Sequence, residues 1–249
     1  MTLKEYAKKR RFDVTPEPSG KTSKDKKESS LIFVVQKHRA TQLHYDFRLE
    51  WKGVLLSWAV PKGPSPDPGV KRLAMQVEDH PLDYANFEGT IPESEYGGGT
   101  VMVWDHGTWT PDAVSEDVDA ALEKGDLKFT LHGKKLKGSW VLVRTRGFGS
   151  SKPGKSWLLI KHRDEYASTE DVTMEKPRSA VSNKLLAEIA EAGGGDVAKA
   201  ATGDPAPKTS GKASQPSRKK PATRSPAGKK SAAAKSGGAG SRRRARKTS

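Results

Sequence analysis

Alternation of polar and apolar side chains is the clearest pattern in the first two thirds of the chain. In residues 44–51 the two kinds alternate without a break. The polar side of this stretch is formed by His44, Asp46, Arg48 and Glu50. Other short alternating or β-branched runs lie at 31–37, 54–60, 72–79, 100–104, 127–131, 139–144 and 157–162. Many short strands at close spacing predict a mainly β fold, a compact antiparallel β-barrel with few short helices.

Three local signals complete this picture, a tight turn and two short helices. Lys52-Gly53, between two of the strands, predicts a tight hairpin turn. A helical pattern at 115–123 predicts one short helix, opened by Ser115 as its cap. A second short amphipathic helix is predicted at 182–192.

Composition changes sharply along the chain. Every Trp, Tyr and Phe lies at or before Tyr166, and the last residues are mainly Ala, Gly, Pro, Ser, Lys and Arg. Such a segment buries too little to offset its chain entropy, so it is expected to be disordered. We therefore expect four parts, namely an N-terminal arm (1–30), a barrel domain (31–166), a linker with a short helix (167–192) and a disordered basic tail (193–249).

The net charge of +15 lies in the two flanks of the chain. Residues 201–249 carry 14 Lys/Arg and one acidic residue, residues 1–30 carry nine basic and five acidic residues, and the rest is nearly neutral. Basic flanks favour a polyanion as binding partner, first of all nucleic acid.

The chain has no cysteine, which excludes disulfides and thiolate sites and fits a reducing cytoplasm. No apolar run is long enough for a membrane span, and no secretory signal is recognisable.

The polar face of residues 44–51 carries metal-ligand chemistry. Residues two apart on a strand point the same way, so His44 and Asp46 can reach one ion. His38, at the end of the preceding strand, can complete the set. Two His and one carboxylate suit Mn²⁺, Fe²⁺ or Zn²⁺ and leave positions open for substrate or water. A polar strand face is usually only solvated, but His-x-Asp-x-Arg beside a second His is unusual there.

Basic residues accompany this set. Arg10, Arg48, Lys62 and Arg72 are candidates for phosphate binding, since arginine and lysine neutralise phosphoryl oxygens.

The alternation of residues 72–79 places Arg72 and Glu78 on one face, with His80 continuing it before a proline. His80 is a candidate for binding a phosphate or for acting as a general acid.

Several sequence blocks, in the same order, resemble the 3′-phosphoesterase domain of bacterial DNA ligase D. The resemblance covers roughly residues 3–166. It is carried by YAKKRRFDVTPEP, FVVQKHRATQLHYDFRLEWKGVLLSWAVPKGPS, VEDHPLDYANFEGTIPESEYGGGTVMVWDHGTW and WLLIKHRDEYA.

The resemblance implies a manganese-dependent enzyme (other divalent metals are an alternative) that heals DNA ends in double-strand-break repair by non-homologous end joining. Such an enzyme removes a 3′-terminal ribonucleoside and then the 3′-phosphate to leave a 3′-OH. The implied metal ligands are His38, His44 and Asp46. The implied catalytic residues are Arg10, Glu17, Gln36, Arg48, His80 and Tyr84. The implied substrate-binding residues are Lys62, Arg72 and Glu78. Part of the arm is expected to fold over this site.

Two features depart from the family. Arg11 stands where the family commonly has aspartate, which weakens the case for ribonucleoside removal more than that for metal binding. No Lys-x-Asp-Gly motif of a nucleotidyl transferase occurs, so we expect a stand-alone homologue with a basic tail.

The expected setting is the bacterial cytoplasm, associated with the nucleoid. The expected partners are DNA with 3′-ribonucleotide or 3′-phosphate ends and a separate repair ligase, polymerase or end-bridging protein, with the protein itself a monomer. Two alternatives stay open. One is a non-catalytic DNA-end-binding module with a histone-like tail. The other is an Fe(II) oxygenase, whose ligand set also contains His-x-Asp and a distant His.

Overall fold

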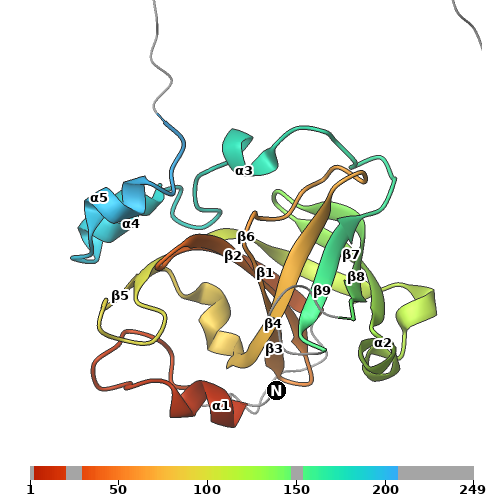
Figure 1. Cartoon of the computed structure of the whole chain (residues 1–249), viewed down its shortest axis with the longest axis horizontal. Coiled ribbons are helices and arrows are strands. Elements are labelled where there is room, and N and C mark those ends of the chain that lie inside the picture. Colours follow the sequence, from red (N-terminus) through yellow and green to blue (C-terminus); the bar gives the residue numbers. More distant parts are fainter. Residues whose placement is uncertain (1–2, 21–29, 147–153, 207–249) are drawn as a thin grey trace, which may run out of the picture. The chain divides into compact units, whose positions relative to one another are not determined.

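A computed structural model describes residues 3–20, 30–146 and 154–206 of the chain (Figure 1). Within these residues, nine strands pair antiparallel throughout. The strands are β1 (Ile32–Arg39), β2 (Leu43–Trp51), β3 (Val54–Val60), β4 (Lys71–Pro81), β5 (Gly89–Ile91), β6 (Gly99–Pro111), β7 (Asp126–Gly133), β8 (Lys137–Arg144) and β9 (Ser156–Lys161).

The sheet closes on itself. Its order is β1-β2-β3-β4-β9-β8-β7-β6, and β6 pairs back onto β1, which makes an eight-stranded barrel. The short β5, which the sequence analysis did not predict, is added at the beginning of β6. The prediction of a mainly β antiparallel barrel with few short helices is therefore confirmed.

The turn between β2 and β3 has the predicted form. Lys52 and Gly53 both have positive φ angles, 49° and 80°, and they separate the paired residues Trp51 and Val54. Two left-handed residues in a two-residue loop match the right-handed twist of the flanking strands. The turn thus fixes the register of β2 on β3.

Strands β1 to β3 are covered on both faces. One face contributes Phe33, Phe47 and Trp58 to the main apolar core, where all three are buried. Against the opposite face packs a second apolar cluster, which includes Tyr6 from the arm and Tyr84. The polar side of β2 is therefore buried as well, instead of facing water.

The helices are short. They are α1 (Leu3–Lys8), the 3₁₀ turns η1 (Leu82–Asn86) and η2 (Ala113–Ser115), α2 (Val118–Lys124), α3 (Val172–Glu175), α4 (Leu186–Ala192) and α5 (Val197–Ala201). The helix predicted at 182–192 is α4. The helix predicted at 115–123 is α2, but Ser115 is not its cap. The Asp117 carboxylate accepts the hydrogen bond from the Ala120 amide, and Ser115 Oγ accepts one from Lys128 N instead.

Residues 193–206 correct the prediction of disorder from residue 193 onward. They contain α5, whose Ala200 is buried in the main core. Asp204 binds the first turn of α4, accepting hydrogen bonds from the amides of Leu186 at 3.0 Å and Ala187 at 2.9 Å. Residues 207–249, the rest of the predicted tail, lie outside the described residues. In the part of the chain that the structure describes, no helix has the length and apolarity to cross a membrane.

The substitution Asp204→Ala tests whether Asp204 caps α4 and so keeps residues 193–206 folded. The two freed amides at the start of α4 lose their acceptor, which should lower the free energy of unfolding by about 1–2 kcal/mol. Urea unfolding measures the change, and hydrogen exchange at Leu186 and Ala187 should speed up. Glu191→Ala, on the exposed side of α4, is the matched control and should change stability by less than about 0.5 kcal/mol. Unchanged exchange at Leu186 and Ala187 would contradict the assignment.

Candidate active site

The β1–β2 pairing brings the predicted metal ligands together. His38 lies directly opposite His44, and Gln36 lies opposite Asp46. Directly opposed residues share a sheet face, as do residues two apart on one strand. His38, His44 and Asp46 therefore share one face near the end of this strand pair that the turn at 40–42 closes, with Arg48 next along β2.

The distances fit a shared ion. His38 Nδ1 lies 3.8 Å from Asp46 Oδ2, and His44 Nε2 lies 3.7 Å from Asp46 Oδ1. One donor atom from each of the three residues can be chosen so that all lie within 4.8 Å of one another. Ligands at about 2.1 Å from one ion lie roughly 3–4 Å apart. Small side-chain movements would therefore let all three bind one divalent cation.

The hydrogen bonding of the two histidines supports this fit. The His44 Nδ1 atom lies 3.1 Å from the carbonyl oxygen of Gln42, to which Nδ1–H can donate. That bond leaves the Nε2 lone pair facing Asp46, the arrangement found in metal-binding histidines. His38 Nε2 is buried and has no hydrogen-bond partner among the described residues. A buried nitrogen without a partner is costly unless something binds it, and a metal ion would do so.

Asp46 is held ionised. Burial alone would raise the pKa of its carboxyl, but Arg48, His44 and His38 outweigh burial and hold that pKa well below its usual range. Arg48 Nη2 lies 3.1 Å from Asp46 Oδ2. The site thus presents a carboxylate ready for a cation, with a fixed guanidinium beside it.

Arg48 is fixed by neutral partners behind the pocket. Its Nε donates to Gln36 Oε1 at 2.8 Å, and Nη1 donates to Ser57 Oγ at 2.8 Å. The Gln36 amide in turn donates to the carbonyl oxygens of Tyr84 and Phe87, both at 2.9 Å. Gln36 therefore orients Arg48 and does not itself line the pocket.

His80 lies between two arginines. Its Nδ1 is 2.9 Å from the carbonyl oxygen of Glu78, to which Nδ1–H can donate, and its Nε2 is 3.2 Å from Arg10 Nη2. Arg48 Nη1 lies 2.9 Å from the same Nδ1. Burial, followed by the charges of Arg48 and Arg10, lowers the pKa of His80 well below its ordinary value. The imidazole is therefore neutral, with a lone pair at Nε2 that can accept a proton or a hydrogen bond.

A bulge in β4 explains how His80 enters the site and why Arg72 does not. Ser57 pairs with Val77, but Leu55 pairs with His80, so β4 carries one extra residue at this point. Val77, Glu78 and His80 all line the pocket, whereas Arg72 lies on the side of β4 that carries the core residue Ala74. The prediction that Arg72 and Glu78 share a face is wrong, because it assumed an unbroken strand.

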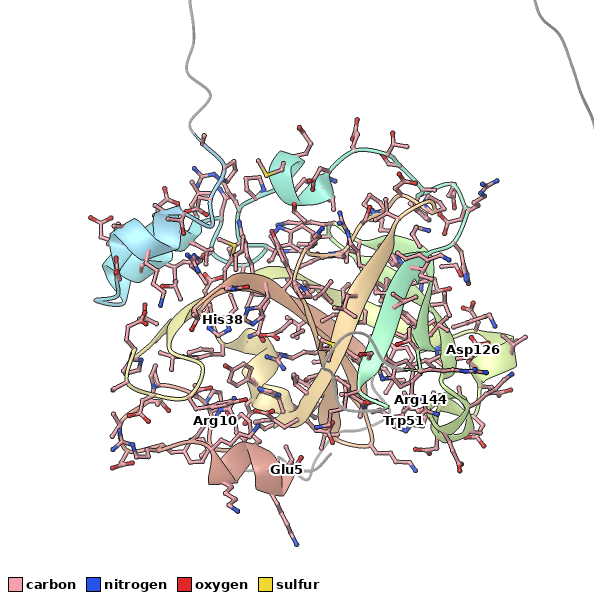
Figure 2. The ribbon with its side chains drawn as sticks, in the orientation of Figure 1. Glu5, Arg10, His38, Trp51, Asp126 and Arg144 are labelled. Atoms are coloured by element: carbon pink, nitrogen blue, oxygen red, sulfur yellow. The ribbon has the colours of Figure 1, made fainter. Side chains whose placement is uncertain are left out.

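The arm reaches the pocket through two of its residues. Arg10 Nε donates to Glu17 Oε1 at 2.8 Å, and the Tyr84 hydroxyl donates to the same oxygen at 3.0 Å. The Arg10 guanidinium lies 3.9 Å from the centre of the Tyr6 ring, and its Nη1 lies 3.4 Å from Glu78 Oε1. Figure 2 shows Arg10, from the arm, and His38, from β1, on the same side of the molecule.

Arg11 takes no part in this network. Its side chain is 64% exposed and pairs with Glu95 at the surface. The position that departs from the family pattern therefore supplies no carboxylate to the pocket.

These residues surround a cavity of about 180 Å³. Nine of the predicted site residues line it, namely Arg10, Glu17, His38, His44, Asp46, Arg48, Glu78, His80 and Tyr84. Gln36 supports it from behind. Lys62, in the exposed turn after β3, and Arg72 are not among its lining residues.

Sequence reasoning missed two contributors. Ser57 holds Arg48, and Tyr96 stands half-exposed at the rim with the Lys9 ammonium 4.7 Å from its ring centre. The local signal for Tyr96 was its position, as an aromatic residue directly before Gly97-Gly98-Gly99.

Comparisons with known proteins point in the same direction. Residues 36–144 match the protein family described as the DNA Ligase D 3′-phosphoesterase domain. The chain is 53% identical over 187 residues to the multifunctional non-homologous end joining protein LigD of Pseudomonas aeruginosa, a match covering 74% of this chain and 22% of that protein. It is 44% identical over 145 residues to the multifunctional non-homologous end joining DNA repair protein LigD of Mycobacterium tuberculosis, covering 58% and 18%. The chain spans about a fifth of the length of these relatives.

A metal titration tests the ligand set. Adding Mn²⁺ should raise the thermal unfolding temperature, since a ligand at 100 times its Kd stabilises by about 2.7 kcal/mol. His44→Ala and Asp46→Asn should remove most of this shift, whereas His132→Ala, at an exposed residue of β7, should keep it. If Mn²⁺ raised the unfolding temperature equally in the unmodified protein and in all three variants, the ion would bind elsewhere. Parallel titrations with Zn²⁺ and Mg²⁺ rank the metals.

The neutral state of His80 has a measurable consequence in the metal-free protein. Unfolded chains take up a proton at histidine near pH 6.5, whereas folded His80 does not. The free energy of unfolding therefore decreases as the pH falls below 6.5, by up to about 1.4 kcal/mol per pH unit. His80→Gln should flatten this dependence, and the midpoint of the NMR titration of the His80 ring should lie well below that of a free histidine. A ring titration centred at or above 6.5 would refute the assignment.

Proposed function

Because the chain contains a 3′-phosphoesterase domain of the DNA ligase D family, we propose that it is a divalent-metal-dependent phosphoesterase acting on DNA 3′ ends. The observation that carries the proposal is the convergence of His38, His44 and Asp46 beside Arg48 in one cavity. A metal-ligand set with open positions next to a fixed guanidinium suits phosphoester hydrolysis.

The metal ligands and Arg48 divide the work of charge stabilisation. An ion held by His38, His44 and Asp46 would act as a Lewis acid on a phosphoryl oxygen. Arg48 is held by Gln36 and Ser57, so its free N–H groups point into the site without further reorganisation. A donor fixed in advance stabilises the negative charge that grows on the phosphoryl oxygens in the transition state.

His80 and Arg10 form the opposite wall. Nε2 of neutral His80 can accept a hydrogen bond or a proton from a water molecule or a hydroxyl group, but it carries no second proton to donate. Of the two roles suggested for His80, phosphate binding and general acid catalysis, the second is therefore disfavoured, and we propose proton acceptance at Nε2 in its place. Arg10, now bound to Glu17, supplies a second guanidinium next to His80.

Tyr84 completes the pocket as a donor. Burial, and then the charge of Glu17, raises the pKa of its phenol well above the usual value, so the hydroxyl keeps its proton. It donates to Glu17 and so fixes an arm carboxylate that lines the cavity.

The finer chemistry follows from the family. We propose manganese as the working ion and removal of a 3′-phosphate, leaving a 3′-OH, as the main reaction. Removal of a terminal ribonucleoside should be the weaker step, since position 11 provides no carboxylate. The setting would be non-homologous end joining, with DNA ends as substrate and a ligase or polymerase activity continuing the repair. The basic residues of 207–249 would add sequence-independent DNA affinity that falls with salt.

Product analysis tests the reaction. A labelled primer ending in one ribonucleotide, or in a 3′-phosphate, is incubated with the protein and Mn²⁺ or with EDTA. With Mn²⁺ the 3′-phosphate should be converted to 3′-OH, and with EDTA no product should form. Absence of phosphate release at saturating Mn²⁺ would refute the phosphoesterase assignment.

The same substrates test the role of position 11. Arg11→Asp should accelerate ribonucleoside removal and leave phosphate release unchanged. Arg11→Ala, which loses the pairing with Glu95 but adds no carboxylate, is the matched control. Equal effects of the two substitutions would show that the residue acts only through the fit of the arm.

Arg48→Lys tests the preorganised guanidinium. A lysine cannot hold Gln36, Ser57 and Asp46 together, so the rate of phosphate release should fall about 10²–10³-fold. Mn²⁺ binding, measured by the titration described above, should persist. Lys124→Arg, at the exposed end of α2, should leave the rate unchanged. A rate near that of the unmodified protein would show that the fork geometry of Arg48 is dispensable.

A further inference from the structure

A second cavity lies at the connection between β7 and β8. It has a volume of about 280 Å³ and is lined chiefly by Lys134, Lys135, Lys137, Lys176, Trp140 and Tyr166, which we call the lysine pocket. No aspartate or glutamate belongs to its lining within the described residues. Lys176 directly follows α3, which is drawn far from α1 in Figure 1 and from Arg10 in Figure 2. The lysine pocket is thus separate from the metal-ligand cavity.

A buried carboxylate holds the backbone of the turn between β7 and β8 in place. Asp105, fully buried, accepts hydrogen bonds from the amides of Lys134 and Lys135 at 3.0 Å each and from that of Leu136 at 2.8 Å. Three backbone donors occupy three of the roughly four acceptor positions of this carboxylate. Asp105 therefore holds three successive residues in place and does not neutralise the lysines above it by direct pairing.

The lysine side chains are held by neutral groups. Lys135 Nζ donates to the carbonyl oxygens of Lys176, at 2.9 Å, and Arg178, and it lies 4.5 Å from the centre of the Trp104 ring. Lys134 Nζ donates to the carbonyl oxygen of Ala180 at 2.6 Å. Among the described residues, the ion pairs do not include any of the four lysines of the pocket.

The local charge is correspondingly uncompensated. Burial lowers the pKa of Lys135 to about 7; Asp105 opposes this change, and the charges of Lys37 and Lys176 add to it. An anion bound in the pocket would reverse this effect, because a negative charge nearby favours the protonated amine. The site is built for a ligand that carries negative charge.

We propose that the lysine pocket binds a phosphate of the DNA backbone, at a point of the duplex away from the 3′ end that occupies the metal-ligand cavity. Exposed lysines at Lys134, Lys137 and Lys176 offer point charges, and the half-exposed Tyr166 ring offers a flat surface for a sugar or a base. This combination of lysine and exposed aromatic surface is typical of nucleic-acid contacts. The inference rests on the proposed function in its choice of DNA.

Glu165 restricts the path that the DNA backbone can take across this surface. It lines a neighbouring cavity of about 530 Å³, which shares Lys137 and Tyr166 with the lysine pocket. A carboxylate repels phosphate, so we place the phosphate on the side of Lys134 and Lys176 rather than in the neighbouring cavity.

Lysine footprinting of the full chain tests the site directly. The acetylation rate of each lysine is measured by mass spectrometry in a buffer that contains EDTA. Three samples are compared, one without ligand, one with a 3′-OH duplex and one with inorganic phosphate. The duplex should slow acetylation of Lys134, Lys137 and Lys176 severalfold and leave Lys124 unaffected. Equal slowing at Lys124, or no slowing at the three pocket lysines, would overturn the proposal. Slowing by millimolar phosphate without an effect of the duplex would also overturn it, because the pocket would then bind a free anion.

Charge reversal provides the energetic test. Each lost phosphate contact should reduce the slope of log K against log salt for duplex binding by about one unit. Lys176→Glu should show this reduction, and Lys176→Glu with Lys134→Glu a larger one. Lys124→Glu carries the same charge change on α2 and should keep the original slope. Identical slopes for all variants would contradict the proposal.

The two hypotheses fail separately. All proteins are also assayed for Mn²⁺-dependent release of phosphate from a 3′-phosphorylated single nucleotide, which cannot span both sites. Footprinting without protection but with intact phosphate release would refute only the lysine pocket as a DNA site. Protection at the pocket without phosphate release would refute only the proposed enzyme activity.

Discussion

The pairing of Asp46 with Arg48 is the interaction on which the site depends. Both side chains are almost fully buried on a strand face that a simple amphipathic hairpin would leave in water. A buried carboxylate alone would take up a proton, and a buried guanidinium alone would be unstable without an anion. Together they keep both charges in a buried pocket, and Gln36 and Ser57 accept hydrogen bonds from two further donors of Arg48. The cavity is therefore charged before any ligand enters, as metal and phosphate binding require.

The cover over this face is part of the same arrangement. Tyr6 and Tyr84 pack on it, and Arg10 stacks on Tyr6 while binding Glu17. The arm thus excludes water from the neighbourhood of Asp46 and Arg48, and exclusion of water strengthens their interaction. Burial also lowers the pKa of His80, and the charges of Arg48 and Arg10 on either side of its ring lower it further.

Local periodicity was enough to predict the parts of the fold and site that lie on regular strands. The alternation of β2 placed His44, Asp46 and Arg48 on one face, and the hairpin register added His38. It failed in β4, where an extra residue reverses the faces and removes Arg72 from the pocket. A bulge leaves no mark in an alternating pattern, since it depends on the pairing with β3.

Non-local contacts set the other limits. Residues 193–206 have a composition typical of disorder, yet Asp204 caps the start of α4 and Ala200 enters the core. The clamp of Asp105 on the β7–β8 turn is also a contact between segments far apart in the sequence. Ser57, by contrast, supports Arg48 from the directly opposite position of the β2–β3 hairpin. Family resemblance supplied Glu17 and Tyr84, which no local pattern singles out.

Anomalous diffraction from crystals grown with Mn²⁺ tests the central claim most directly. The account predicts a single strong manganese peak bonded to His38, His44 and Asp46, at about 2.0–2.3 Å from one atom of each. It also predicts that Arg48 remains next to Asp46 in that crystal. A manganese peak at other residues, or Asp46 paired only with Arg48 at saturating manganese, would contradict it.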